Sequence, residues 1–183
     1  MPGTSGTLYT IGHSNHPWEK FVDLLRAQHI EVVVDVRSQP YSRYTPHFNG
    51  TALKVALPAQ RIKYLYLGQE LGGRPVGREF YDADGHVLYD RLAESPAFLA
   101  GIERLATGLL KYRVAIMCAE ENPAACHRRR LVASAIARRG HTVVHIRGDG
   151  RLQTEDELRR EEQRQPELFD VPDEGDGAPS ISK

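Results

Sequence analysis

The segment Cys118-Ala-Glu-Glu-Asn-Pro-Ala-Ala-Cys-His-Arg128 concentrates side chains that could do chemistry. A thiol at the end of a predicted strand can act as a nucleophile when an imidazole or a helix N-terminus favours its thiolate form. If a helix begins at Pro123, the free amide groups of its first turn point toward Cys118 and can bind an anion. On that helix, His127 and Arg128 each lie one turn before an apolar residue, so both are expected to line a pocket.

Three kinds of chemistry are compatible with this segment. As a nucleophile, Cys118 needs a partner such as His13 or His127, although a buried apolar role is common for a free cysteine. A tyrosine-phosphatase-like loop is disfavoured because Ala124 stands where that loop requires arginine. The spacing of Cys118 and Cys126 matches no common zinc pattern, so we expect no metal and no cofactor.

The third kind of chemistry is an anion pocket, because arginine pairs bidentately with phosphate. The alternative is a network of salt bridges, such as one between Asp35 and Arg37, that only fixes loops. The candidate catalytic residues are His13, Asp35, Cys118, Glu120 and His127. The candidate substrate-binding residues are Gly12, Ser14, Arg37, Arg43, Arg74 and Arg128.

Strands and helices must bring these distant residues together. Short apolar runs rich in β-branched and aromatic residues predict five strands, at 7–11, 32–36, 63–67, 113–117 and 142–146. Helical patterns lie between most of them and predict a three-layer α/β domain with a mainly parallel sheet and helices on both faces. In such sheets, ligands bind beyond the carboxyl ends of the strands, where the candidate residues are concentrated.

Helix and turn signals divide the chain further. Pro17 follows possible caps at residues 14–16, and Ser95-Pro96 begins a second helix. Residues 74–92 contain a turn signal and are predicted to form a small insertion. We expect one α/β domain over 1–152 and an acidic segment over 153–183, which begins as a charged helix and continues as a disordered tail.

Composition excludes several classes of protein. The chain has 183 residues, 40% hydrophobic and 26% charged, which fits one ordinary domain. No apolar run reaches the roughly 18 residues of a membrane span, and the N-terminus lacks a secretory pattern. With only two cysteines, a reducing cytoplasmic location is expected. The net charge is zero, but residues 153–183 carry −6 and the rest carries +6, which suits a polyanionic partner.

The motifs taken together resemble those of the bacterial domain-of-unknown-function family 488. The resemblance covers about residues 7–147 and implies a compact α/β domain whose polar motifs form a shared site, but no established activity. The matching motifs are Thr10-Ile-Gly-His-Ser14, Val34-Asp-Val-Arg37 with Pro40, Ser42 and Arg43, Leu71-Gly-Gly73, Cys118-Ala-Glu and Cys126-His-Arg128.

A short motif in the acidic segment suggests a partner. Gln165, Leu168 and Phe169 have the spacing of the peptide by which bacterial repair proteins bind the DNA sliding clamp, although Pro166 departs from that pattern. An apolar pair in an acidic tail has no core of its own to join, and a groove on a partner could bury it.

Three functions therefore remain open. The first is an enzyme acting on a phosphate-containing substrate, a nucleotide or a nucleic acid. The second is a non-catalytic module, associated with DNA repair and recruited to the clamp. The third is a Cys-dependent transferase or redox protein.

Overall fold

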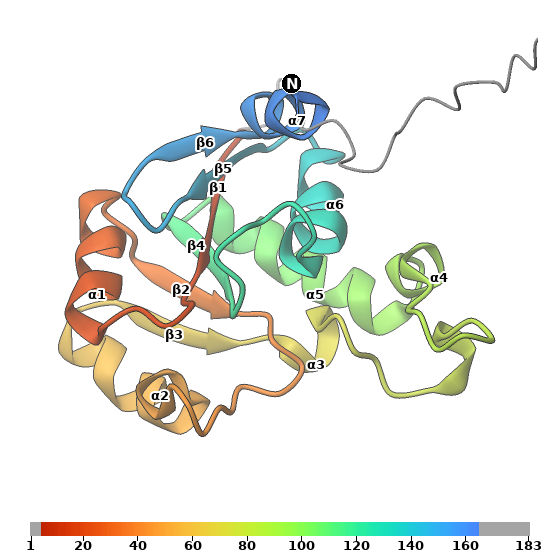
Figure 1. The fold of residues 1–183 in the computed structure, drawn as a ribbon, viewed down its shortest axis with the longest axis horizontal. Coiled ribbons are helices and arrows are strands. Elements are labelled where there is room, and N and C mark those ends of the chain that lie inside the picture. The colour runs from red at the N-terminus through yellow and green to blue at the C-terminus, as the bar shows by residue number, and fades with distance from the viewer. Residues whose placement is uncertain (1–4, 165–183) are drawn as a thin grey trace, which may run out of the picture.

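The computed structural model describes residues 5–164, which form a six-stranded sheet with helices on both faces (Figure 1). The strand order is β3-β2-β4-β1-β5-β6, and every neighbouring pair is parallel except β5 and β6. The strands are β1 (Thr7–Gly12), β2 (Val32–Asp35), β3 (Lys63–Tyr66), β4 (Val114–Cys118), β5 (Thr142–Ile146) and β6 (Leu152–Thr154). The predicted three-layer α/β architecture is confirmed.

Two hydrophobic clusters cover the sheet, one on each face. α1 (Trp18–Ala27) and α2 (Gly50–Ala59) contribute to the cluster on one face, together with Phe48 from the short helix Pro46–Phe48. α3 (Gly68–Leu71), α5 (Pro96–Leu109), the π-helical turn Arg128–Ala133 and α6 (Ser134–Ala137) pack on the other face. The central strands β1, β2 and β4 are buried almost throughout, which explains their continuous apolar sequences.

Helix starts follow the sequence signals only in part. The Ser95 hydroxyl accepts a hydrogen bond from the amide of Phe98 and caps α5, as Ser95-Pro96 predicts. Pro17 is the N-cap of α1, one residue before the first helical position. The prediction that a helix begins at Pro123 is wrong, because residues 119–126 form a loop and helical structure starts at Arg128.

Two segments depart from the alternation of strand and helix. Residues 74–92 leave the body as an excursion, with the short helix Arg78–Phe80, a bridge between Tyr81 and Val87, and α4 (Tyr89–Ala93) (Figure 1). The predicted boundary at 152–153 falls inside β6, which pairs with β5 and leads into α7 (Glu155–Arg164). Leu158 of α7 is buried, so this charged helix is packed against the domain.

The sliding-clamp motif at 165–169 lies outside the described residues. Within the described part, no helix has the length and apolar character needed to cross a membrane.

Candidate functional site

A cavity of about 690 Å³ lies beyond the carboxyl ends of β2 and β4. Its walls come from three loops: the segment after β2 (Arg37, Ser38), the excursion (Arg74, His86, Tyr89) and the loop after β4 (Cys118, Glu120). His127 and Arg130 complete it from the start of the π-helical turn. A cavity is therefore present at the edge of the sheet where polar residues were predicted to gather.

Cys118 ends β4 at the inner wall of this cavity and is only 7% exposed. A hydrogen bond from the Cys126 thiol lowers the pKa of Cys118 to about 7, against the opposing effect of burial. The amides of Ala119 and Glu120 and the charge of Arg128 lower it further. The loop thus stabilises a thiolate.

His127 lies beside this sulfur with a fixed orientation. Its Nε2 is 2.9 Å from the carbonyl oxygen of Val36, which can only accept, so Nε2 carries a proton and, in the neutral ring, Nδ1 has the lone pair. Nδ1 is 3.7 Å from Cys118 Sγ and 4.0 Å from Cys126 Sγ. Gly73 packs on the ring, since a Cβ there would lie 2.6 Å from His127 Cγ.

Two arginines hold the loop after Cys118 in place. The guanidinium of Arg128 donates to the carbonyls of Glu120 and Glu121, the second at 2.8 Å, and to the Thr10 hydroxyl at 3.3 Å. Arg147 binds both carboxylate oxygens of Glu121 at 2.9 and 3.0 Å, which lowers the pKa of Glu121 to about 2. The amides that face Cys118 are therefore fixed before any ligand arrives.

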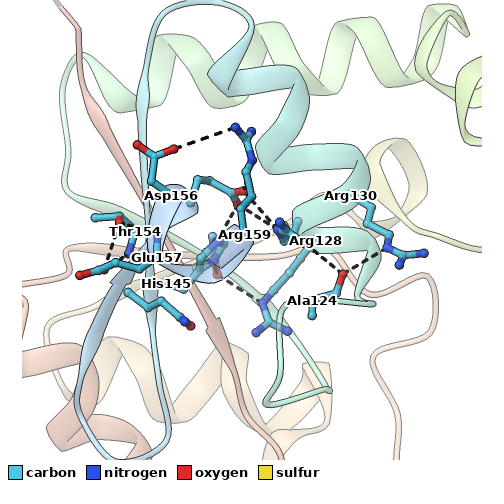
Figure 2. A network of polar contacts seen from close by, with 12 residues as sticks. Ala124, Arg128, Arg130, His145, Thr154, Asp156, Glu157 and Arg159 are labelled. Atoms are coloured by element: carbon cyan, nitrogen blue, oxygen red, sulfur yellow. Dashed lines mark hydrogen bonds and ion pairs between the residues drawn. The ribbon is translucent and has the colours of Figure 1, made fainter. Parts of the chain in front are cut away.

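The contacts of Arg128 continue into a chain of polar groups (Figure 2). The Thr10 hydroxyl lies 2.8 Å from His145 Nδ1, and His145 Nε2 donates to Glu155 at 2.7 Å. Glu155 also accepts from Arg129, so the chain ends at the first turn of α7. Burial lowers the pKa of His145, although the hydrogen bond to Glu155 opposes the shift. The terminal helix is thus connected to the loop of Cys118.

A second buried network stands behind the cavity. Both carboxylate oxygens of Asp35 accept from Arg37, at 2.9 and 2.6 Å, and one also accepts from Tyr64. The remaining donors of Arg37 reach His13 Nε2 at 3.0 Å and the carbonyl of Phe48 at 2.7 Å. Asp35 is completely buried, so its charge is matched within the protein and this network fixes the loop after β2.

This network makes stability depend on pH. Burial, followed by the positive charge of Arg37 and then of His47, lowers the pKa of His13 to about 4, although Asp35 and the carbonyl of Ser14 oppose the shift. His13 therefore takes up a proton below about pH 6.5 in the unfolded chain, but only below about pH 4 in the folded chain. We expect the free energy of unfolding to fall by about 3 kcal/mol over this window, as measured by urea denaturation.

A His13→Asn variant separates this effect from other groups. It should be less stable at neutral pH, and its stability should change less between pH 6.5 and about 4 than that of the wild type. An equal pH dependence in both proteins would contradict the assignment to His13.

The structure divides the predicted site residues into three groups. Those that line the cavity are Arg37, Arg74, Cys118, Glu120 and His127. Those that support it from behind are Gly12, His13, Ser14 and Asp35, and none of these four lines it. Arg43 lies off the cavity against Tyr44, and Arg128 is fully buried on backbone carbonyls. Of the four arginines expected to converge on one anion, only Arg37 and Arg74 line the cavity, and the guanidinium of Arg37 is bound to Asp35.

Sequence reasoning missed Arg130, His86 and Tyr89, which also line the cavity. Arg130 is exposed, and its Nε donates to the carbonyl of Ala124. It also borders a second cavity of about 420 Å³, together with Arg129, Arg138 and Arg159. The excursion that carries His86 and Tyr89 was predicted, but nothing in its sequence indicates that it folds toward Cys118.

Two groups of described residues have ligand atoms close enough together for one metal ion. They are Cys118, Cys126 and His127 at the cavity, and the exposed set Asp82, Asp84 and His86. Each offers only three side-chain ligands, and we assign no ion to either.

A family model described as "Domain of unknown function DUF488" matches residues 17–135, more than half of the chain. The match includes every residue that lines the cavity. Neither the curated proteins nor the solved structures contain a match.

Proposed function

The chain belongs to the DUF488 family, whose description names no activity, and we propose that it is an enzyme that uses Cys118 as a nucleophile on a phosphate-containing substrate. The observation that carries this proposal is the placement of one thiol. Cys118 Sγ faces a cavity, with the free Nδ1 of His127 at 3.7 Å and fixed amide donors around it. A base within reach of a thiol, itself oriented by a third group, is the arrangement expected for nucleophilic catalysis.

His127 has the role of the base in this proposal. Its Nε2–H is held by Val36, so Nδ1 can take the proton of Cys118 and later return it to a leaving group. His13 and Asp35 are poorer candidates for proton transfer, because both are buried, hydrogen-bonded to Arg37 and absent from the cavity wall.

Arg74 and Arg130 have the role of anion binding. Both are exposed at the cavity, and neither has a carboxylate partner within hydrogen-bonding distance among residues 5–164. Arg37 lines the same cavity, but most of its guanidinium donors already bind Asp35, His13 and the carbonyl of Phe48. Two guanidinium groups without a carboxylate partner, in the same cavity as a thiolate, favour a substrate with a phosphate near its reactive centre.

Alkylation of Cys118 tests both parts of the proposal. The rate with iodoacetamide should rise with a midpoint near pH 7, because the loop lowers the pKa of Cys118 to about 7. The Cys118→Ser variant should lose this rapid reaction, since Cys126 is almost completely buried. Pyrophosphate, used as a phosphate probe, should slow alkylation of the wild type.

Matched variants give the control. Arg130→Ala should abolish protection by pyrophosphate, whereas Arg139→Ala should retain it, because Arg139 borders neither cavity and pairs with Glu103. A midpoint at or above about 8.5, the value of a free thiol, would overturn the nucleophile assignment. Equal protection in all three proteins would overturn the anion-binding assignment.

A further inference from the structure

A second thiol lies directly behind the first. Cys126 is 1% exposed and is absent from the cavity wall, whereas Cys118 lines it. Their sulfur atoms and His127 Nδ1 all lie within 4.8 Å of one another. Both cysteines are buried, but neither belongs to the two hydrophobic clusters that cover the faces of the sheet.

His127 can serve both thiols in turn. Its free Nδ1 is 3.7 Å from Cys118 Sγ and 4.0 Å from Cys126 Sγ, and its other nitrogen is fixed on Val36. Cys126 donates its thiol hydrogen to the sulfur of Cys118, which raises the pKa of Cys126. That restraint disappears once the sulfur of Cys118 is bonded to a substrate, and the proton of Cys126 can then pass to His127.

We propose that the site reduces a small disulfide that carries phosphate groups, with Cys118 as the attacking thiol and Cys126 as the resolving thiol. This proposal rests on the proposed function, because its first step uses Cys118 as the nucleophile. It adds the reacting bond, the substrate class and a role for Cys126.

The steps balance as an ordinary thiol–disulfide exchange. The thiolate of Cys118 attacks one sulfur of the substrate, the substrate S–S bond breaks, and the first substrate thiolate leaves and takes up a proton. Cys126 gives its proton to His127 and attacks Cys118 Sγ, which breaks the mixed disulfide. The second substrate thiolate leaves with the proton from His127. The substrate gains two electrons and two protons and becomes two thiols, and the protein loses two electrons and two hydrogens as the Cys118–Cys126 disulfide forms.

The closure joins two residues that lie at the ends of elements. Cys118 is the last residue of β4, and Cys126 lies in the loop just before the π-helical turn, so neither is in the middle of a rigid element. The two sulfur atoms lie within 4.8 Å of one another and must come to about 2 Å to form the bond. Rotation about the two Cα–Cβ bonds can supply part of this movement. Arg74 and Arg130 supply the preference for phosphate groups at the cavity.

The full-length reduced protein can be tested with coenzyme A disulfide as the phosphate-bearing probe, with products read by intact mass spectrometry and thiol release. The wild type should lose two hydrogens, retain no adduct and release two thiols. Cys126→Ser should release one thiol and keep a coenzyme A adduct on Cys118. Cys126→Ala repeats this test without a buried hydroxyl, in case the serine variant does not fold.

The outcomes distinguish this inference from the proposed function. A stable adduct on Cys118 in the wild type would overturn the resolving role of Cys126 and leave Cys118 as a nucleophile. No reaction of Cys118 in the wild type, with disulfide or iodoacetamide, would overturn both. Cystamine, a cationic disulfide, should react at least about tenfold more slowly than coenzyme A disulfide. Arg130→Ala should remove most of that difference, and an unchanged difference would overturn the substrate class.

Discussion

Replacing Arg128 with methionine should destabilise the protein by about 3 kcal/mol or more, the largest effect we expect from a single polar side chain. Arg128 is completely buried, and its guanidinium donates to the carbonyls of Glu120 and Glu121 and to the Thr10 hydroxyl. Methionine fills similar space but leaves the two carbonyls without a donor, and each unsatisfied buried group costs about 1–3 kcal/mol.

The same substitution should also change the chemistry of the site. Without Arg128, the carbonyls of Glu120 and Glu121 lose their side-chain donor, and one positive charge near Cys118 is lost. The midpoint of Cys118 alkylation should therefore move to higher pH. Denaturation with urea measures the first effect, and alkylation under native conditions measures the second.

Arg130→Met is the matched control for stability. Arg130 lies two residues further along the same turn but is exposed, and its replacement should change the free energy of unfolding by no more than about 0.5 kcal/mol. Equal stabilities for the two variants would mean that Arg128 does not anchor the loop.

Arg128 and Arg130 also show where sequence reasoning failed. It placed Arg128 in the pocket and did not include Arg130, because it started the helix at Pro123. The loop over 119–126 instead delays helical structure to Arg128, and a π-helical turn follows. Such wide turns often occur at functional sites. The direction of each arginine depends on hydrogen bonds between this turn and the carbonyls of a loop, which local periodicity does not encode.

The sheet was easier to predict, because its information is local. Continuous apolar runs such as Val32–Val34 and Val114–Met117 are typical of strands covered on both faces, and these segments are central strands. β6 was missed because its three residues include only one apolar side chain, Leu152. Its pairing with β5 depends on the tight turn at Gly150, where φ is +89°.

The support behind the site was predicted only as an alternative. An Asp35–Arg37 salt bridge was one interpretation of that segment, and the structure contains it at 2.6 Å. The participation of His13, Tyr64 and the Phe48 carbonyl depends on three other segments of the chain. A sequence without contacts indicates which residues can pair, but it does not reveal which pairs are buried.

Substituting Gly12 with alanine should destabilise the protein by about 3 kcal/mol and weaken the thiolate of Cys118. Gly12 ends β1 directly beside Cys118, and a Cβ built there would lie 1.8 Å from the carbonyl oxygen of Glu120 and 2.8 Å from Cα of Glu121. These are backbone atoms that Arg128 holds in place, so no side-chain rotation can relieve the clash.

The clash at Gly12 should therefore move the loop that carries the amides of Ala119 and Glu120 away from the sulfur of Cys118, and the alkylation midpoint should rise above pH 7. Gly108→Ala is the matched control. Nothing lies within 4 Å of a Cβ built at Gly108 in α5, and alanine favours a helix over glycine by up to about 1 kcal/mol. This variant should be as stable as the wild type or more stable, with unchanged alkylation. If Gly12→Ala behaves in the same way, the close approach of β1 to the loop does not position Cys118.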